Sequence, residues 1–351
     1  MAYKYTHFIP QNVAPVNAKS IGVYDSKGEK VYTIPLGRLT PPMKEKLYSF
    51  GLVSDMHLYK IITSWDGNTK FDNALTYFES KNCVFCAHCG DITQTGLYSE
   101  GDKVNLAPVQ FEKYKEICDK HTIPVYGLCG NHENYVVPIT NNLTELKYYT
   151  GTELYYTITH GNDLFIFIGQ PSYNEVMGDD ALLWLYETLE ENRNKRCFVF
   201  IHPYIEEDSG DPLDYRKNSV FDYWGVTKTT AFMNVMRHYK NAVLFHGHSH
   251  TKYECQEWDK TANYTEKNGF RSVHVPSSTT PRDLDLSAGA TVNDNYGSQG
   301  CVVDVYDDCI VLNGMDFINN KPVPLGTYKI DTKLIQIAPN TFTDSTGTIT
   351  T

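Results

Sequence analysis

The amino-acid sequence predicts an α/β fold, in which buried strands alternate with helices that cover both faces of the sheet. Short apolar runs lack the polar alternation of a half-exposed strand, so both of their faces must be covered. Between these runs, apolar residues recur at helical spacing, as in Phe71, Leu75 and Phe78. The two patterns alternate from residue 47 to residue 245, and the chain is long enough to enclose a large core.

Five apolar runs are typical of buried strands, because each is short and ends in polar residues. They are residues 47–53, 83–89, 123–128, 197–201 and 242–245. Residues 154–158 and 164–168 predict a hairpin, because the polar segment 160–163 between them suits a turn. The helical pattern covers residues 71–78, 111–121, 181–196 and 227–238.

The segments that flank this alternation have a different composition. Residues 1–45 contain two β-like runs around Ser26-Lys27-Gly28, and we expect a β-hairpin extension followed by a Pro-rich linker. The main domain is expected over residues 46–332 and ends in a second hairpin. Residues 333–351 are expected to form a C-terminal tail, because the last dozen are rich in Thr and almost uncharged.

The charge and the cysteines restrict partners and location. With 31 basic and 42 acidic residues, the net charge of -11 argues against broad electrostatic binding to nucleic acid or to a membrane. A phosphorylated substrate stays compatible, because bound divalent cations reverse the local field. The sequence shows no signal peptide and no apolar run of membrane-spanning length. Because the nine cysteines suit buried thiols in a reducing compartment, we expect a cytoplasmic protein.

Each of the five core runs leads into residues that can bind a metal ion. These residues are Asp55, His57, Asp91, Asn131, His132, Glu133, His202, His248 and His250. Ligands bind at the carboxyl ends of the strands in an open α/β sheet, so we expect these side chains to converge. Together they offer enough oxygen and imidazole donors for two cations that share a bridging group.

A second cysteine-rich pattern, Cys83-x-x-Cys86-x-x-Cys89, is interpreted as structural. Side chains alternate along a strand, so Cys86 would face away from the other two cysteines. The sequence also has no second CxxC pair to complete a zinc site.

The strand-end residues resemble those of the calcineurin-like metallophosphoesterases, whose pattern is D-x-H, G-D, G-N-H-[DE], a lone H and G-H-x-H. All five elements occur in order over residues 51–250, each behind an apolar run. The resemblance implies a four-layer α-β-β-α sandwich, to which residues 1–45 would add a small β appendage. It also implies hydrolysis of a phosphate ester by a hydroxide bound to two divalent metal ions, either Mn, Fe or Zn.

The resemblance assigns a role to each motif residue. The two ions would be held by separate sets, namely Asp55, His57 and His250 at the first, and Asn131, His202 and His248 at the second. Asp91 would bridge the ions. His132 would be the catalytic residue that faces the phosphate and the leaving group, with Asn131 also contacting the substrate.

Two further positions bear on catalysis. The phosphoprotein phosphatases of this family carry a carboxylate three residues after the bridging Asp, where this chain has Gln94. A neutral amide cannot stabilise an imidazolium as an anion would, so a general-acid role of His132 stays open. Arg282, in the loop-rich stretch after the last motif, suits bidentate binding of a substrate phosphate, although an ordinary structural role suits it equally.

The predicted function is hydrolysis of a phosphodiester or a phosphomonoester, with the diester slightly preferred because Gln94 argues against a protein phosphatase. The substrate would be a phosphorylated small molecule or polymer. The alternative is a structural or adhesive component, with virion association, that carries the phosphoesterase domain. Such a protein would dock into a larger assembly through its N-terminal extension.

Overall fold

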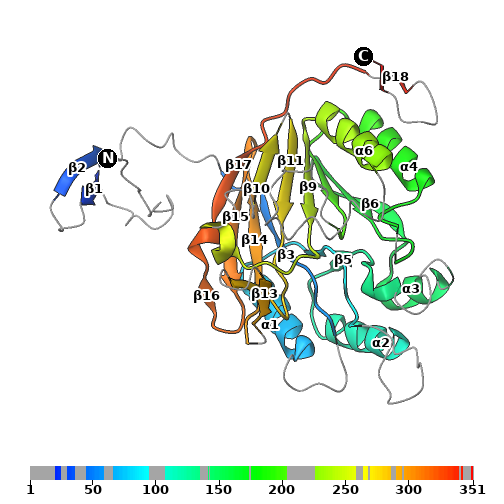
Figure 1. Ribbon diagram of the computed structural model, residues 1–351, viewed down its shortest axis with the longest axis horizontal. Helices are drawn as coiled ribbons and strands as arrows, with labels where there is room; N and C mark the ends of the chain where they lie inside the picture. Colours follow the sequence, from blue (N-terminus) through cyan, green and yellow to red (C-terminus); the bar gives the residue numbers. More distant parts are fainter. Residues whose placement is uncertain are drawn as a thin grey trace.

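The computed structural model describes residues 20–24, 30–35, 45–58, 66–94, 107–134, 141, 143–173, 175–203, 226–257, 264–267, 269–285, 290–294, 296–339, 341–342 and 349–350. Two large sheets dominate this part of the chain, and helices lie outside them (Figure 1).

The first sheet has seven strands, in the order β16-β15-β14-β3-β4-β5, with β17 paired to β15. Its parallel part consists of β3 (Tyr48–Val53), β4 (Cys86–His88) and β5 (Val125–Gly127). The antiparallel part consists of β14 (Gln299–Val305), β15 (Cys309–Asp316), β16 (Lys321–Pro322) and β17 (Tyr328–Asp331).

The second sheet has six strands, in the order β10-β11-β9-β8-β7-β6. Four of them run parallel, namely β7 (Asp163–Ile168), β8 (Cys197–Phe200), β9 (Ala242–His246) and β11 (Phe270–His274). Antiparallel strands form both edges, namely β6 (Tyr155–His160) and β10 (Tyr264–Lys267).

Helices cover the outer face of each sheet. Apolar side chains of α1 (Gly67–Ser80), α2 (Ala107–Cys118) and α3 (Leu143–Thr150) pack with outward residues of the first sheet. Side chains of α4 (Asp179–Glu191) and α6 (Val226–His238) pack on the second. The predicted four-layer α-β-β-α sandwich is therefore confirmed (Figure 1).

The space between the two sheets is filled largely by aromatic rings. On the second sheet, Phe167, Phe200 and Phe245 come from three neighbouring strands and stack at centroid distances of 4.7 and 5.1 Å. The alternate residues of the same strands, such as Val199 and Leu244, face the helices. Each strand thus carries apolar side chains on both faces, which explains the unbroken apolar runs of the sequence.

Several predicted elements differ in extent from those observed. The run 123–128 forms a strand only at Val125–Gly127, after Pro124, which has no N–H for the ladder. The run 83–89 pairs as a strand only from Cys86. Cys83 therefore lies outside the strand, and it is buried in the same cluster as Cys86, whereas the two side chains were expected to face opposite sides. All nine cysteines are free. Helix α3 and the strands β10 and β11 have no counterpart in the prediction, because their sequences are too polar or too short for a clear period.

The remaining strands form small sheets. Near the N-terminus, β1 (Ser20–Tyr24) pairs antiparallel with β2 (Lys30–Pro35) in a sheet of their own. Two further pairs are β12 (Arg282–Asp285) with β13 (Ala290–Asn293), and β18 (Thr341–Phe342) with β19 (Ile349–Thr350). Within the described residues, 3₁₀ turns are found at η3 (His132–Asn134), η6 (Tyr253–Glu257) and η7 (Pro324–Gly326). Among the helices that the structure describes, none is long and apolar enough to cross a membrane.

The chain after residue 332 packs on the second helical layer. The Asn241 side chain donates to the Ile335 carbonyl at 2.8 Å and accepts from the Ile335 N–H at 3.1 Å. Ile337 is buried in the cluster formed with α4 and α6. Packing against the main domain thus continues beyond the point where the tail was expected to begin.

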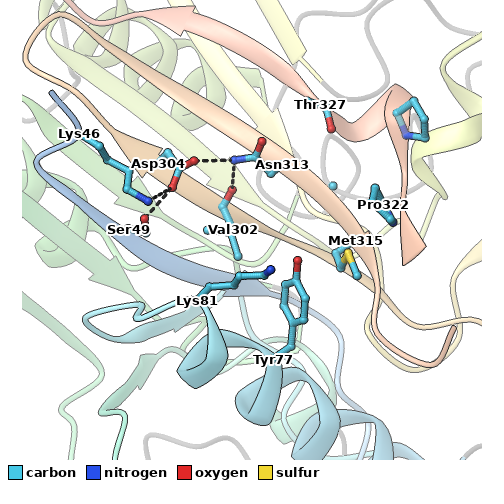
Figure 2. A pocket seen from close by; sticks show the side chains of 12 residues that line it. Lys46, Ser49, Tyr77, Lys81, Val302, Asp304, Asn313, Met315, Pro322 and Thr327 are labelled. Atoms are coloured by element: carbon cyan, nitrogen blue, oxygen red, sulfur yellow. Dashed lines mark hydrogen bonds and ion pairs between the residues drawn. The ribbon is translucent and has the colours of Figure 1, made fainter. Parts of the chain in front are cut away.

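A cavity of about 380 Å³ lies on the outer face of the first sheet, beside α1 (Figure 2). Its polar wall is the Asp304 carboxylate, which accepts hydrogen bonds from Lys46, Ser49 and Asn313. Ser49 belongs to the amino-terminal part of β3, whereas the predicted ligands follow the carboxyl ends of the strands. This cavity is therefore separate from the predicted site.

A buried ion pair joins the two sheets at the same end. The guanidinium of Arg196 donates to both oxygens of Asp163, at 3.0 and 2.5 Å, and to the Tyr306 carbonyl at 2.6 Å. Tyr48, on β3, donates its hydroxyl to Asp163 at 2.5 Å. Because both charged groups are buried, each depends on the other for its hydrogen bonds.

We expect Asp163→Ala to lower the free energy of unfolding by about 3–5 kcal/mol, since it leaves the Arg196 guanidinium buried without its counter-ion. Chemical denaturation measures this change. The control is Lys113→Ala, which breaks an exposed pair with Glu116 and should cost less than about 1 kcal/mol. Equal losses in the two variants would contradict the importance of the buried pair.

Candidate metal centre

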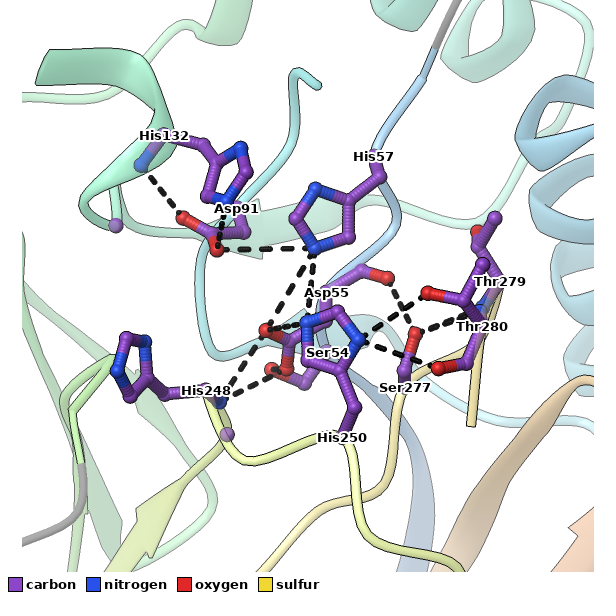
Figure 3. Close-up of polar contacts among 12 residues, drawn as sticks. Ser54, Asp55, His57, Asp91, His132, His248, His250, Ser277, Thr279 and Thr280 are labelled. Atoms are coloured by element: carbon purple, nitrogen blue, oxygen red, sulfur yellow. Dashed lines mark hydrogen bonds and ion pairs between the residues drawn. The ribbon is translucent and has the colours of Figure 1, made fainter. Parts of the chain in front are cut away.

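The predicted ligands gather where the two sheets present the carboxyl ends of their parallel strands (Figure 3). Four of them follow strands of the first sheet, namely Asp55 and His57 after β3, Asp91 after β4 and Asn131 after β5. Three follow strands of the second, namely His202 after β8 and His248 and His250 after β9. The structure thus brings all seven residues together.

One group consists of Asp55, His57, Asp91 and His250, whose donor atoms lie within 4.8 Å of one another. The His250 Nε2 atom is 3.1 Å from Asp55 Oδ1 and 3.0 Å from His57 Nε2. His57 Nε2 is also 3.7 Å from Asp91 Oδ2. Four donor atoms therefore converge on one small volume.

A second group surrounds the His202 ring. Its Nε2 atom lies 3.0 Å from Asn131 Oδ1, 3.1 Å from His248 Nδ1 and 3.1 Å from Asp91 Oδ2. Asp91 belongs to both groups, and its Oδ2 atom faces a histidine of each. This is the position that a bridging ligand requires.

The backbone at these residues leaves the strand conformation sharply. Five candidate ligands have positive φ angles between 45° and 72°, namely Asp55, His57, Asp91, His248 and His250. A left-handed conformation costs about 1–2 kcal/mol for a residue other than glycine, so surrounding contacts must hold these loops. The loops also approach closely, because a Cβ atom at Gly247 would overlap Ser54 Oγ and Asp55 Oδ2.

The orientation of the imidazoles fits a metal centre. The Nδ1 atom of His202 donates to the Cys89 carbonyl at 2.8 Å, and that of His250 to the Thr280 carbonyl at 3.2 Å. In the neutral rings, each Nε2 therefore presents a lone pair to the carboxylate oxygens and to the other ring. So many lone pairs repel one another unless a cation lies among them. Divalent metal ions would supply that positive charge.

The electrostatics point the same way. Burial would raise the pKa of Asp91, but the imidazoles, His202 above all, hold it far below its usual value. Burial lowers the pKa of His57 strongly and that of His248 to about 3, so both rings are neutral, as metal ligands must be. At His202, burial lowers the pKa, but the negative charge of Asp91 outweighs burial and the pKa rises to about 9. The carboxylate thus favours positive charge beside His202, which a proton supplies in the ion-free site and which a bound cation would supply in place of that proton.

His132 lies at the rim of the site, with 22% of its side chain exposed. Its main-chain N–H donates to Asp91 Oδ1 at 3.0 Å. Its ring Nδ1 donates to the main-chain carbonyl of Gln94 at 2.8 Å. The Nε2 atom is 3.9 Å from Asp91 Oδ2 (Figure 3). A peptide oxygen thus orients this ring, and the sequence could not reveal it because the partner is not a side chain.

Glu133 contributes to the site in a way that the sequence analysis did not assign. Its buried carboxylate accepts hydrogen bonds from the Thr93 N–H at 2.7 Å and the Gly130 N–H at 2.6 Å. It thereby joins the loop of Asp91 to that of Asn131. Burial and then the charge of Asp91 raise its pKa to about 7. The signal was present as the last position of the G-N-H-[DE] motif.

Arg282 lies beside the loop of the last two candidate ligands. Its main-chain N–H donates to the His250 carbonyl at 2.7 Å, and its main-chain carbonyl accepts from the Lys252 N–H at 3.0 Å. Burial lowers the pKa of its guanidinium, and the opposing charge of Asp55 only partly offsets this effect. Binding of a substrate phosphate by this guanidinium stays a prediction.

Comparisons with known proteins bear on the family and on the fold of the chain. A family model described as calcineurin-like phosphoesterase matches residues 48–252. The fold is similar to that of a dimetal phosphatase from Danio rerio, with a TM-score of 0.59, 14% identity, and coverage of 82% of this chain and 100% of that one. A phosphoesterase from E. coli, Yfce, is also similar, with a TM-score of 0.36, 11% identity, and coverage of 81% and 100%.

A comparison with curated protein sequences finds no match. The family model nevertheless spans more than half of the chain and includes every strand end that carries a candidate ligand. The chain therefore belongs to the calcineurin-like phosphoesterase family.

Proposed function

We propose that the protein hydrolyses phosphate esters with two divalent metal ions bound at the site in Figure 3. The observation that carries this proposal is the position of Asp91, whose carboxylate belongs to both groups of candidate ligands. Two-metal sites hold their ions about 3.5–4 Å apart, so a shared ligand is expected. The other ligands would be Asp55, His57 and His250 for one ion, and Asn131, His202 and His248 for the other.

The donor set suits Mn, Fe or Zn, because it mixes carboxylate oxygens with imidazole nitrogens. When bound, two such ions would supply positive charge to the phosphoryl oxygens and make a water molecule more acidic. The chain's own residues would bind and orient the phosphate beside them.

His132 is the proposed catalytic residue at the rim. Its Nδ1 is engaged with the Gln94 carbonyl, so the ring can hold or move a proton only at Nε2. A neutral carbonyl does not stabilise a protonated imidazole as a carboxylate would. We therefore propose that His132 orients the phosphate, together with Asn131, and gives little help in protonating the leaving group.

This proposal favours a phosphodiesterase over a protein phosphatase. The substrate would be a phosphorylated small molecule or polymer, with a phosphodiester slightly preferred to a monoester. The ratio of the activities on bis-p-nitrophenyl phosphate and on p-nitrophenyl phosphate, measured with Mn²⁺, distinguishes a phosphodiesterase from a phosphomonoesterase.

A role in a larger assembly is a second candidate function. The β1–β2 hairpin forms a sheet of its own, and a two-stranded hairpin is marginally stable alone. Docking against another protein would stabilise it. Light scattering tests this role, and a monodisperse, active monomer or dimer would count against it.

We expect Asp91→Asn to lower kcat/KM on bis-p-nitrophenyl phosphate by more than about 100-fold, because it weakens both ion sites. Metal analysis should find about two ions per wild-type chain, the number expected for a two-metal site, and fewer in the variant. The control is Asp304→Asn, a carboxylate of the same sheet far from the site, which should keep both ions and the activity. Full activity in Asp91→Asn, or a wild-type chain without metal, would refute the proposal.

We expect His132→Asn to lower kcat by about 100-fold because the phosphate is held less precisely, and by a similar factor for diesters that release p-nitrophenol and phenol. A proton donor is needed most by the poorer leaving group, so a positioning residue affects both alike. A loss that is at least about tenfold greater for phenol release would instead assign proton donation to His132.

We expect Arg282→Ala to raise KM by roughly tenfold with a smaller change in kcat, if its guanidinium binds the phosphate. Arg193→Ala, on the outer side of the second sheet, serves as the control. Unchanged KM in Arg282→Ala would leave Arg282 with its structural role alone.

A further inference from the structure

Four consecutive hydroxyl residues, Ser277 to Thr280, lie directly behind the loop that carries Asp55 and His57. The segment follows β11, and its four side chains are at most 3% exposed. Ser54 and Ser277 form an isolated parallel bridge, so the two segments run side by side where the β3 ladder has ended. Hydroxyl groups this deeply buried need hydrogen-bond partners.

Their partners are the main-chain carbonyls of the metal loop. The hydroxyl of Ser278 donates to the Ser54 carbonyl at 3.1 Å. The hydroxyl of Ser277 donates to the Asp55 carbonyl at 2.9 Å (Figure 3). The hydroxyl of Thr279 donates to the Met56 carbonyl. Three successive carbonyls thus each receive one hydroxyl donor.

This arrangement answers a need created by the loop itself. Asp55 and His57 are left-handed, with φ of 51° and 45°, so the chain at Asp55 and Met56 cannot continue a regular ladder. The Ser54 carbonyl, by contrast, also accepts the main-chain N–H of Ser278 at 2.9 Å. A buried carbonyl without a partner is costly, and water has no access here. Hydroxyl donors from a neighbouring segment hold the loop in the conformation that points both side chains into the site.

Ser277 uses its whole hydrogen-bonding capacity for this purpose. Besides its donation to Asp55, its oxygen accepts from the N–H groups of Thr279 and Thr280, at 3.1 and 2.9 Å. A serine hydroxyl has one donor and two acceptor positions, and all three are filled. The same side chain therefore shapes its own segment and the metal loop.

Thr280 contacts a candidate ligand directly. The Nδ1 atom of His250 lies 3.1 Å from Thr280 Oγ1 and 3.2 Å from the Thr280 carbonyl (Figure 3). Both oxygens can accept the Nδ1 proton, which leaves Nε2 toward Asp55. The segment is also anchored from behind, because Lys70 of α1 donates to the Thr279 carbonyl and Ser298 donates to the Ser278 carbonyl.

We propose that Ser277–Thr280 is a positioning segment that sets the metal affinity of the group formed by Asp55, His57 and His250. This inference rests on the proposed metal-dependent function. It assigns no contact with substrate to the segment. Its effect should therefore be seen in ion binding by the resting protein, without any assay of activity.

The test compares Ser277→Ala with Ser49→Ala. Both serines are buried and donate one side-chain hydrogen bond, but Ser49 lies near the amino end of β3, where it bonds to Asp304. Titration calorimetry with Mn²⁺ should show one of two binding events weakened by about tenfold or more in Ser277→Ala. Ser49→Ala should bind both ions as the wild type does.

A second pair of variants guards against misfolding. Thr280→Val keeps the shape of the side chain but removes the Oγ1 acceptor, so it should weaken the same event by a smaller factor. Thr280→Ser should restore it. Circular dichroism verifies the fold of each variant before titration, and Thr280→Val decides the outcome if Ser277→Ala does not fold.

The outcomes separate this inference from the proposed function. Suppose that the wild type binds two ions and that Ser277→Ala, or a folded Thr280→Val used in its place, binds them with unchanged affinities. This result would overturn the inference and leave the proposed phosphoesterase function intact. The inference would also be overturned if Ser49→Ala lost as much affinity for Mn²⁺ as Ser277→Ala and Thr280→Val. A wild-type chain that binds no Mn²⁺ would overturn the inference and the proposed function together.

Discussion

The packing of the two sheets against each other is the constraint on which the site depends. Each sheet supplies only part of the ligand set, since Asp91 comes from the first and His202 from the second, with 3.1 Å between their donor atoms. The aromatic layer between the sheets, including stacked Phe167 and Phe200, fixes their relative position. Closely packed rings leave little freedom to slide, so the core determines the geometry of residues that it does not touch.

The ligand loops add a second constraint, because they reach the site through backbone that lies beyond the ends of the strands. Positive φ angles at Asp55 and at His250 turn the chain so that residues two apart face the same point. Such conformations persist only when several contacts enforce them. Here Glu133 and the hydroxyls of Ser277–Thr280 provide those contacts, so much of the polar network around the centre holds main chain.

Much of the fold and most of the site could be predicted from the sequence, since both left strong patterns. Apolar runs such as that ending before Asp55 mark strands covered on both faces, and the ligand motifs follow them at loop-sized intervals. Weaker patterns were missed, as with the short strand β11, whose place beside β9 depends on tertiary packing. The hydroxyl segment was visible as Ser-Ser-Thr-Thr, but composition alone does not reveal what buried hydroxyls contact.

The hydrogen bond from His132 to the Gln94 carbonyl has a consequence for the evolution of this site. Every amino acid carries a main-chain oxygen, so the tautomer of His132 is inherited with the path of the loop and not with a particular side chain. The orientation of this ring therefore places no demand on the side chain at position 94, provided that the loop keeps its course. Homologues that differ at this position could therefore keep the same orientation of this ring, although an acidic side chain there would add a charge that Gln94 lacks.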